Sequence, residues 1–344
     1  MTSRSPSIED IARAAGVANS TVSRALRDSP LISVDVRAHI QRLAREMGYT
    51  PNGIAQSLQT KRTNTIGLVV TSIADPFFAV VAKGVEDGAQ SAGLSVFLSA
   101  SHNDPAREIA VIETFQRRRV DGIIVADSQI SSNYTQRLMR IDVPTVLINS
   151  QADEQSTLLH SVAVDDYSGA RLAVEHLLEL GHRSIGYLGA GNRPKSNRRR
   201  LEGYRDALTD ADVQPHDSWV AIAPAEDVLH EDDVIAGQAL SIPLLNAGVT
   251  AIFCYNDMIA IGALMACREQ GIAVPQDLSV IGFDDIAMAQ YVTPPLTTIL
   301  QPKIQLGRAA IQMLLDLLDN RPVQNHVISP IFMPRASTTT PPHK

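Results

Sequence analysis

The chain has 344 residues, of which 44% are hydrophobic and 19% charged, and its formal net charge is −7. A chain of this length exceeds one ordinary hydrophobic core, so we expect two or three folded units. Because no apolar run reaches the roughly 18 residues that span a bilayer, this composition excludes a membrane-embedded protein.

Charge is distributed unevenly along the chain. Residues 1–62 contain nine Lys and Arg against five Asp and Glu, whereas the remainder contains 21 against 32. A basic N-terminal segment attached to an acidic body indicates that only the N-terminal segment contacts a polyanion.

The N-terminus and the cysteines favour the cytoplasm. The first residues have neither the apolar stretch nor the cleavage site of a secretory signal. Cys254 and Cys267 carry no CxxC spacing and no accompanying histidine pair. We therefore expect a cytoplasmic protein with buried free thiols, no disulfide, no metal site and no cofactor.

The first fifty residues are expected to form three short helices. Ser7 and Asp10 predict a capping arrangement at the start of the first, and Gly16 predicts the turn that ends it. A second helix is expected over 19–26. Ser33 is expected to cap a third, which ends at Gly48. Its buried face would contain Val36, Ile40, Leu43, Ala44 and Met47.

From residue 65 onward, strands and helices alternate. Amphipathic segments such as 77–91, 167–180 and 256–270 predict helices between the strands. This alternation is typical of parallel sheets built from βαβ units, and its length predicts two doubly wound lobes. Ligands of such folds bind beyond the carboxyl ends of the strands. The predicted buried strands lie at 66–70, 94–98, 122–126, 145–149, 161–164, 185–189, 251–255 and 279–283.

The segment DIARAAGVANSTVSRAL, residues 10–26, carries the strongest functional signal. Two short helices joined at Gly16 predict a helix-turn-helix, whose second helix lies in the major groove of DNA. Small polar side chains with one arginine can reach base edges or phosphates there without steric conflict. A plain helical hairpin with a polar surface is the alternative reading. The candidate DNA contacts on this helix are Asn19, Ser20, Thr21, Ser23 and Arg24.

The run A-G-V-x-x-x-T-V-S-R-x-L at 15–26, with V-R-x-x-I at 36–40 and G-Y-x-P-N at 48–52, resembles the head of the LacI/GalR family. The resemblance covers essentially the whole chain, in family order. Further matching blocks are DPFF at 75–78, VDGIIV at 120–125, LGHRSIGYLG at 180–189, NDMIAIGAL at 256–264, VPQDLSVIGFDD at 274–285 and PPLTTILQP at 294–302.

The resemblance implies roles for the DNA-binding residues. It assigns base reading mainly to Asn19 and Ser20, with Arg24 nearby, and phosphate contacts to Thr21 and Ser23. Leu58 matches the hinge leucine that family members insert into a minor-groove step, which kinks the duplex. The chain departs from the family pattern at Ala18, Gly53, Gln56 and Gln59, which implies fewer phosphate contacts. The other expected hinge contacts are Asn52, Ala55 and Gln59.

The resemblance also implies an effector site in loops between the lobes. Aromatic side chains would stack on a ring, carboxylates would accept protons from hydroxyl groups, and an arginine would fork onto ligand oxygens. Core packing is the alternative role for one of the two phenylalanines, Phe77 or Phe78. The implied effector contacts are Asp75, Phe77, Phe78, Ser128, Asn149, Ser196, Arg200, Asn256 and Asp284.

The implied architecture is α/β and has three parts. A small all-α helix-turn-helix head would occupy residues 1–50, a hinge helix 51–62, and a two-lobed core like a periplasmic binding protein 63–344. Both lobes would be doubly wound parallel sheets. One would contain 63–162 and 290–322, and the other 163–289 and 323–344.

We expect a transcriptional regulator that is not an enzyme. As a homodimer, it would repress by binding a pseudo-palindromic double-stranded DNA operator and release it when a sugar binds between the lobes. A purine or similar corepressor is the alternative effector. A solute-binding protein for a transporter is the alternative from another class, but it leaves the head unexplained. The sequence contains no P-loop, HExxH or GxSxG motif, so an enzyme is the least favoured class.

Overall fold

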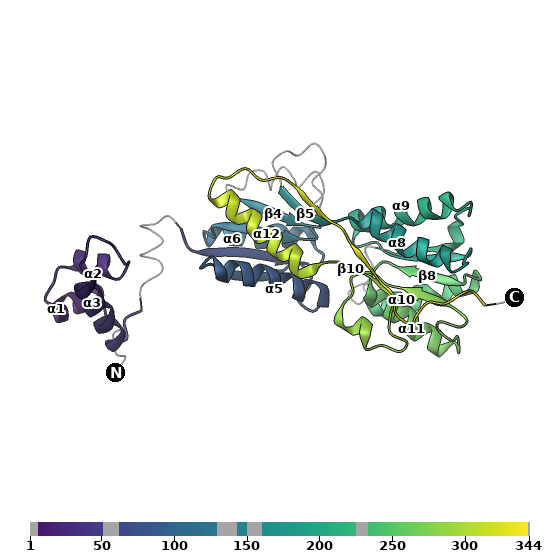
Figure 1. Ribbon diagram of the computed structural model, residues 1–344, viewed down its shortest axis with the longest axis horizontal. Coiled ribbons are helices and arrows are strands. Elements are labelled where there is room, and N and C mark those ends of the chain that lie inside the picture. Colours follow the sequence, from purple (N-terminus) through teal and green to yellow (C-terminus); the bar gives the residue numbers. More distant parts are fainter. Residues whose placement is uncertain (1–5, 51–61, 129–142, 150–159, 225–232, 343–344) are drawn as a thin grey trace. The chain divides into compact units, whose positions relative to one another are not determined.

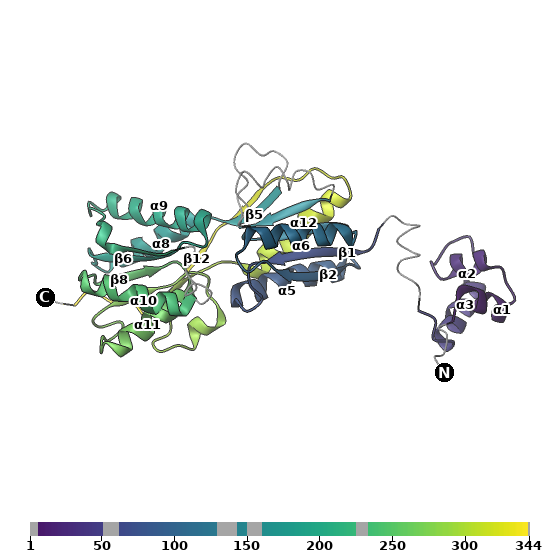
Figure 2. The ribbon, with the colours of Figure 1, turned by 180° about the vertical axis from the view of Figure 1, so that it is seen from behind.

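The computed structural model describes residues 6–50, 62–128, 143–149, 160–224 and 233–342. The chain divides into two compact units, residues 1–63 and 64–344. Figure 1 and Figure 2 show the helices and strands of both units from opposite sides. Within the described ranges, no helix is long and apolar enough to cross a membrane.

The N-terminal unit contains the three predicted helices. They are α1 (Ile8–Ala15), α2 (Asn19–Ala25) and α3 (Val34–Glu46). The Ser7 hydroxyl accepts a hydrogen bond from the Asp10 amide at 3.3 Å, and the Asp10 carboxylate accepts one from the Ser7 amide at 2.9 Å. The predicted capping arrangement is therefore present as a reciprocal capping box.

The three helices bury one small core. Ile11, Val22 and Ile40 are fully buried in it, each from a different helix. Two details of the predicted third helix are wrong. Val36 is 38% exposed, because the core does not extend along α3 beyond Ile40 toward its N-terminus. Ser33 stands at the N-cap of α3, but its hydroxyl makes no capping hydrogen bond.

The first lobe of the second unit is built on a six-stranded sheet. Every strand pairing in it is parallel, in the order β11-β5-β4-β3-β1-β2. Its strands are β1 (Thr65–Val70), β2 (Ser95–Ala100), β3 (Gly122–Ala126), β4 (Thr145–Ile148), β5 (His160–Val164) and β11 (His326–Ile328). Its helices are α5 (Pro76–Ser91), α6 (Pro105–Arg117) and α12 (Lys303–Leu318).

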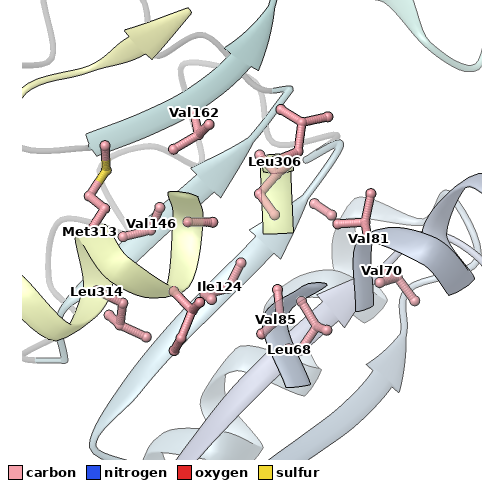
Figure 3. Packing of buried hydrophobic residues seen from close by; sticks show 14 of the residues in the cluster. Leu68, Val70, Val81, Val85, Ile124, Val146, Val162, Leu306, Met313 and Leu314 are labelled. Carbon is pink, nitrogen blue, oxygen red and sulfur yellow. The ribbon is translucent and has the colours of Figure 1, made fainter. Parts of the chain in front are cut away.

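These helices cover both faces of the first sheet. Side chains alternate between the faces along each strand. On β1, Leu68 and Val70 face α5 and α12, whereas Val69 faces α6. Figure 3 shows the first of these two layers, in which Val81 of α5 and Leu314 of α12 pack against the sheet.

The second lobe is built on a four-stranded sheet in the order β7-β6-β8-β9, also with parallel pairings. Leu188 on β6 faces α10 and α11, whereas Tyr187 faces α8 and α9. The strands are β6 (Ile185–Ala190), β7 (Val220–Ala223), β8 (Ala251–Cys254) and β9 (Ser279–Ile281). The helices are α8 (Asp166–Glu179), α9 (Pro194–Asp210), α10 (Asp233–Asn246) and α11 (Asp257–Glu269), with short 3-10 turns η1 (Asp217–Trp219) and η3 (Ala287–Gln290).

The chain passes between the lobes three times. It leaves the first lobe after β5, returns through β10 (Thr298–Leu300) to α12, and leaves again between β11 and β12 (Ile331–Met333). β10 and β12 pair antiparallel as a separate two-stranded sheet, which Figure 1 shows where the lobes meet.

The strand pairings differ from the predicted lobe boundaries. β11 pairs with β5, so residues 326–328 belong to the first sheet and not to the second lobe. Conversely, Leu296 packs in the core of the second lobe. The periodicity did not predict β7, β10, β11 or β12, because these short strands are not buried along their whole length as β8 and β9 are.

Asp257 at the start of α11 ties the second lobe to the crossing strand β10. Its carboxylate accepts hydrogen bonds from the Thr298 hydroxyl at 2.5 Å and from the Ile286 amide at 2.8 Å. Burial raises the pKa of Asp257 to about 7, against the opposing effect of these two hydrogen bonds.

The close approach of α5 and α12 leads to a first prediction. A Cβ on Gly307 would lie 2.3 Å from the Val81 carbonyl oxygen. We expect Gly307→Ala to lower the free energy of unfolding by about 1–3 kcal/mol, although alanine ordinarily favours a helix by roughly 1 kcal/mol over glycine. Urea unfolding of the full-length protein measures the change.

Gly88→Ala on α5 is the matched control for this prediction. The three atoms nearest to its added Cβ all belong to the side chain of Ile311, the closest at 2.4 Å. A side chain can move where the backbone of a packed helix cannot. If the Gly307→Ala protein is as stable as the Gly88→Ala protein, the predicted clash between the added Cβ and the Val81 carbonyl is wrong.

Asp257 leads to a prediction about pH. Its pKa in the folded protein lies above its unfolded value, so its contribution to stability is lost as the pH rises from about 4 to 7. Asp257→Asn removes this titration, and its amide can still bond both Thr298 and Ile286. From pH 5 to pH 8, the unfolding free energy of the variant relative to wild type should rise by about 2 kcal/mol. A difference between Asp257→Asn and wild type that stays constant from pH 5 to pH 8 would disprove the titration of Asp257.

Candidate functional site

The second helix of the head carries the first candidate site. Asn19, Ser20 and Arg24 are exposed on α2, while Thr21 and Ser23 are half-buried. The Arg27 guanidinium donates hydrogen bonds to the hydroxyl and the carbonyl of Ser23. The opposite side of the helix is fully buried in the head core. α2 is thus held rigidly while a small polar surface with one long cation faces outward.

The predicted hinge contacts cannot be located in the same way. Asn52, Ala55, Leu58 and Gln59 lie outside the described residues. The insertion of Leu58 into a DNA step stays a prediction.

The second candidate site is a narrow pocket between the two lobes. Every lining residue follows a strand or lies in the first turns of the helix after it. The first lobe contributes residues after β1, β3 and β4, the second contributes residues after β6, β8 and β9, and the crossing strand β10 contributes one. They are Asp75, Phe77, Asp127, Asn149, Arg193, Ser196, Arg200, Tyr255, Asn256, Asp284 and Gln301.

Seven of the nine predicted effector residues line this pocket. The other two, Phe78 and Ser128, do not. Phe78 is 1% exposed and packs in the core of the first lobe, with its ring edge-on to that of Phe77 at 5.1 Å between centroids. Ser128 is buried, and its hydroxyl donates to the Glu108 carboxylate at 2.5 Å.

Four lining residues were not predicted. Asp127 follows the strand of the VDGIIV block, and Gln301 lies in the PPLTTILQP block. Tyr255 directly precedes a predicted position, Asn256. Arg193 lies in the loop after β6, where a search for charged residues behind each strand would have found it.

Arg193 makes an ion pair across the lobes. It stands at the N-cap position of α9 in the second lobe, and its Nη1 donates to the Asp127 Oδ2 of the first lobe at 2.5 Å. Its Nη2 lies 3.6 Å from the Asp75 Oδ2. Its guanidinium also lies over the Phe78 ring, 5.3 Å from the centroid. Burial lowers the pKa of Arg193, but Asp127, Tyr255 and Asp75 outweigh burial and raise it.

Arg200 is held entirely within the second lobe. Its Nε and Nη2 each lie 2.8 Å from the Asp166 Oδ1, and its Nη1 donates to the Tyr255 carbonyl at 2.5 Å. The guanidinium carbon lies 3.6 Å from the Phe283 ring centroid and 4.3 Å from that of Tyr255. Arg200 is only 2% exposed, so all three of its nitrogens already have protein partners.

Amide and carboxyl groups form a chain along another wall of the pocket. Asn149 donates from Nδ2 to the Gln301 Oε1 at 3.2 Å, and Gln301 donates from Nε2 to the Asp284 Oδ1 at 2.6 Å. Lys303 donates to the Asp284 carbonyl. Burial raises the pKa of the Asp284 carboxyl well above its usual range, against the opposing charge of Arg200. This wall therefore offers groups that both donate and accept.

Two predicted contacts are also helix caps. The Asp75 Oδ1 accepts from the Phe77 amide at 2.9 Å and caps α5. The Asn256 Oδ1 accepts from the Ile259 amide at 2.8 Å and caps α11, while its Nδ2 donates to the Asp233 Oδ2 at 2.5 Å. Capping fixes both side chains in the pocket and uses part of their hydrogen-bonding capacity.

The pocket is chemically suited to binding. It contains acceptors, donors, two guanidinium groups and two aromatic rings. Its one aliphatic hydroxyl group, on Ser196, is bonded to the Tyr255 phenol at 2.7 Å, and the lining includes no histidine, cysteine or lysine to activate it. In the part of the chain that the structure describes, no group of three or more His, Cys, Asp or Glu could hold a metal.

Comparison with known proteins matches both units. Residues 7–52 match the family described as "Bacterial regulatory proteins, lacI family", and residues 174–338 match the "Periplasmic binding protein-like domain". The chain is 35% identical to the ribose operon repressor of Haemophilus influenzae over 338 residues, which cover 96% of this chain and 98% of that protein.

Two solved structures are similar in fold and sequence. One is the Lac repressor dimer bound to operator and the anti-inducer ONPF, with a TM-score of 0.87 and 27% identity, covering 98% of this chain and 100% of that one. The other is a LacI family regulator of Enterococcus faecium with bound ribose, with a TM-score of 0.69 and 30% identity, covering 80% of this chain and 99% of that one.

Proposed function

Because this chain belongs to the LacI family of bacterial regulatory proteins, we propose that it is a repressor whose DNA binding is released by a sugar. The operator would be bound by the heads of a homodimer, and the sugar by the pocket between the lobes. The observation that carries this proposal is the convergence of seven implied effector residues on one pocket. The chain's relatives are regulators, and nothing on the pocket wall favours an enzyme.

The outward face of α2 supports sequence-specific DNA binding. Asn19 and Ser20 can reach base edges in a major groove, and Arg24 can pair with a guanine or a phosphate. The similar Lac repressor structure contains an operator and is a dimer. Residues 1–50 would act as the head and 51–62 as the hinge.

The composition of the pocket supports a sugar. A sugar has an apolar CH face and a rim of hydroxyls that both donate and accept hydrogen bonds. Phe77 supplies an apolar surface, while Asn149, Gln301 and Asp284 supply mixed donors and acceptors. The similar regulator of Enterococcus faecium holds ribose.

The position of the pocket supports allosteric control. Its walls come from both lobes, so a ligand that contacts Asp127 and Arg193 at once favours one lobe arrangement over another. A ligand shifts an equilibrium only through such a difference in affinity. We propose that the preferred arrangement changes the spacing of the two hinges in the dimer.

The surface of the first lobe supports the homodimer. β2 is an edge strand, and Phe97 and Leu98 on it are 46% and 50% exposed. Leu98 also lines an apolar groove together with Ile73 and Val96. An exposed apolar edge of this kind is ordinarily covered by another chain.

The DNA assignment predicts a loss of specificity in Arg24→Ala. An operator is first selected from a random double-stranded library on the wild-type protein. Arg24→Ala should then weaken binding to that operator by about 1–3 kcal/mol, and weaken binding to unrelated DNA much less. Arg42→Ala, an exposed arginine on α3, removes the same charge without a base contact and should leave the ratio of the two affinities unchanged. Equal ratios for both variants would rule out base reading by Arg24.

The effector assignment predicts which compounds stabilise the protein. Ribose, galactose or another monosaccharide should raise the melting temperature and release the selected operator. Gln301→Leu should weaken that sugar about tenfold or more by leaving its hydroxyls unpaired, and should keep operator binding. Gln312→Leu on the exposed side of α12 is the matched control. If adenine or hypoxanthine stabilises the protein and no sugar does, a corepressor function replaces the sugar proposal.

A further inference from the structure

Charge in the pocket is matched within the protein itself. The lining contains three carboxyl groups, Asp75, Asp127 and Asp284, and two guanidinium groups, and burial raises the pKa of Asp75 and Asp284 above the usual range. Arg193 is paired with Asp127 and Asp75, and Arg200 with Asp166 behind the wall. A guanidinium binds an anion strongly when its fork of donors is open. Arg200 has partners on all three nitrogens, whereas Arg193 donates a hydrogen bond only from Nη1 and has two acidic side chains beside its charge.

The environment of Arg193 is unusually acidic. The charges of Asp75, Asp127 and Asp233 all raise the pKa of Arg193. These residues come from three different places, at the starts of α5 and α10 and after β3. Its Nε is buried without a hydrogen-bond partner, so the side chain is held mainly by the two carboxylates and the Phe78 ring. Removing the guanidinium would leave several carboxylates close together with no counter-ion, which a low-dielectric site strongly disfavours.

We propose that Arg193, through its pairing with Asp127 and Asp75, sets the charge of the ligand, so that the pocket accepts an uncharged sugar and rejects phosphorylated and aminated sugars. This inference rests on the proposed sugar-binding function and adds the ligand's charge to it. A phosphate would find the Arg200 fork occupied and the charge of Arg193 already opposed by Asp127 and Asp75. An ammonium would face two fixed cations, with Asp127 and Asp75 paired to Arg193 and Asp166 paired to Arg200.

The inference assigns opposite effects to the two partners of the ion pair. Loss of the Asp127 charge frees part of the Arg193 fork for an anion. Loss of the Arg193 charge leaves Asp75 and Asp127 as receptors for a cation. Loss of both restores a balanced pocket. An Arg193 that merely holds the lobes together would give all three variants similar defects with every ligand.

The test uses three sugars that differ only in charge: galactose, galactosamine and galactose 6-phosphate. Glucose, glucosamine and glucose 6-phosphate form a second set, and ribose with ribose 5-phosphate a third. Calorimetric titration of the full-length wild type should give the tightest binding for the uncharged sugar, with the charged forms at least about 30-fold weaker. A wild type that prefers a phosphate ester or an amino sugar overturns the inference.

The same titrations are then made with Asp127→Asn, Arg193→Gln and the double variant. Asp127→Asn should improve the phosphate ester relative to the uncharged sugar by about tenfold or more. Arg193→Gln should improve the amino sugar by a similar factor, and the double variant should return toward wild type. The inference is overturned if both single variants change their preference among the charged and uncharged sugars in the same direction, or if neither changes it. If Arg193→Gln does not fold, Arg193→Lys takes its place. Because it keeps the charge, it must keep the preference for the uncharged sugar.

A final arm separates this inference from the sugar proposal. If no sugar binds the wild type, the sugar proposal fails, and inorganic phosphate then tests the charge assignment alone. Phosphate should raise the melting temperature of Asp127→Asn and leave the wild type and the double variant unchanged. The same response in all three proteins means that phosphate binds elsewhere and overturns the role assigned to Arg193.

Discussion

Both sheets of the core are parallel, and a parallel sheet directs the carboxyl ends of all its strands to one edge. In this protein the two edges face a common space, since the chain crosses between the lobes beside them. Residues as far apart in sequence as Asp75, Asn149 and Asp284 therefore meet in one pocket. Each follows a different strand, and the caps that begin α5 and α11 fix the side chains at those ends.

A second constraint acts within that space. Charges removed from water must be paired, and breaking one buried pair leaves its partner uncompensated. Asp127 with Arg193, and Asp166 with Arg200, satisfy this requirement in different ways. The pair of Asp166 and Arg200 lies within the second lobe, where it holds Arg200 in the lining of the pocket. The first joins the lobes, so the chemistry of the pocket and the arrangement of the lobes depend on the same contact.

The periodicity of the sequence predicts the three helices of the head and eight of the strands, because buried apolar runs alternate with amphipathic segments. The seven pocket residues were implied by the family resemblance and not by periodicity. The sequence does not show which of two neighbouring aromatic side chains lines a pocket, so Phe78 was assigned to the ligand although it packs in the core of the first lobe. Nor does it reveal partners that folding brings together. The Ser128 hydroxyl donates to Glu108, and Arg193 pairs with Asp127 of the other lobe. β11 is short and mostly exposed, so it does not stand out as a buried strand.

The order of segments along the chain also bears on how this protein is made. α12 and β11 complete the first lobe, and β12 with Ser337, which bonds Val280 and Thr297, completes the second. All of these lie after residue 302. A ribosome must therefore synthesise the chain beyond residue 302 before either lobe can close. Until then the apolar face that α12 covers stays open, which makes the growing chain a natural client for chaperones that shield such surfaces.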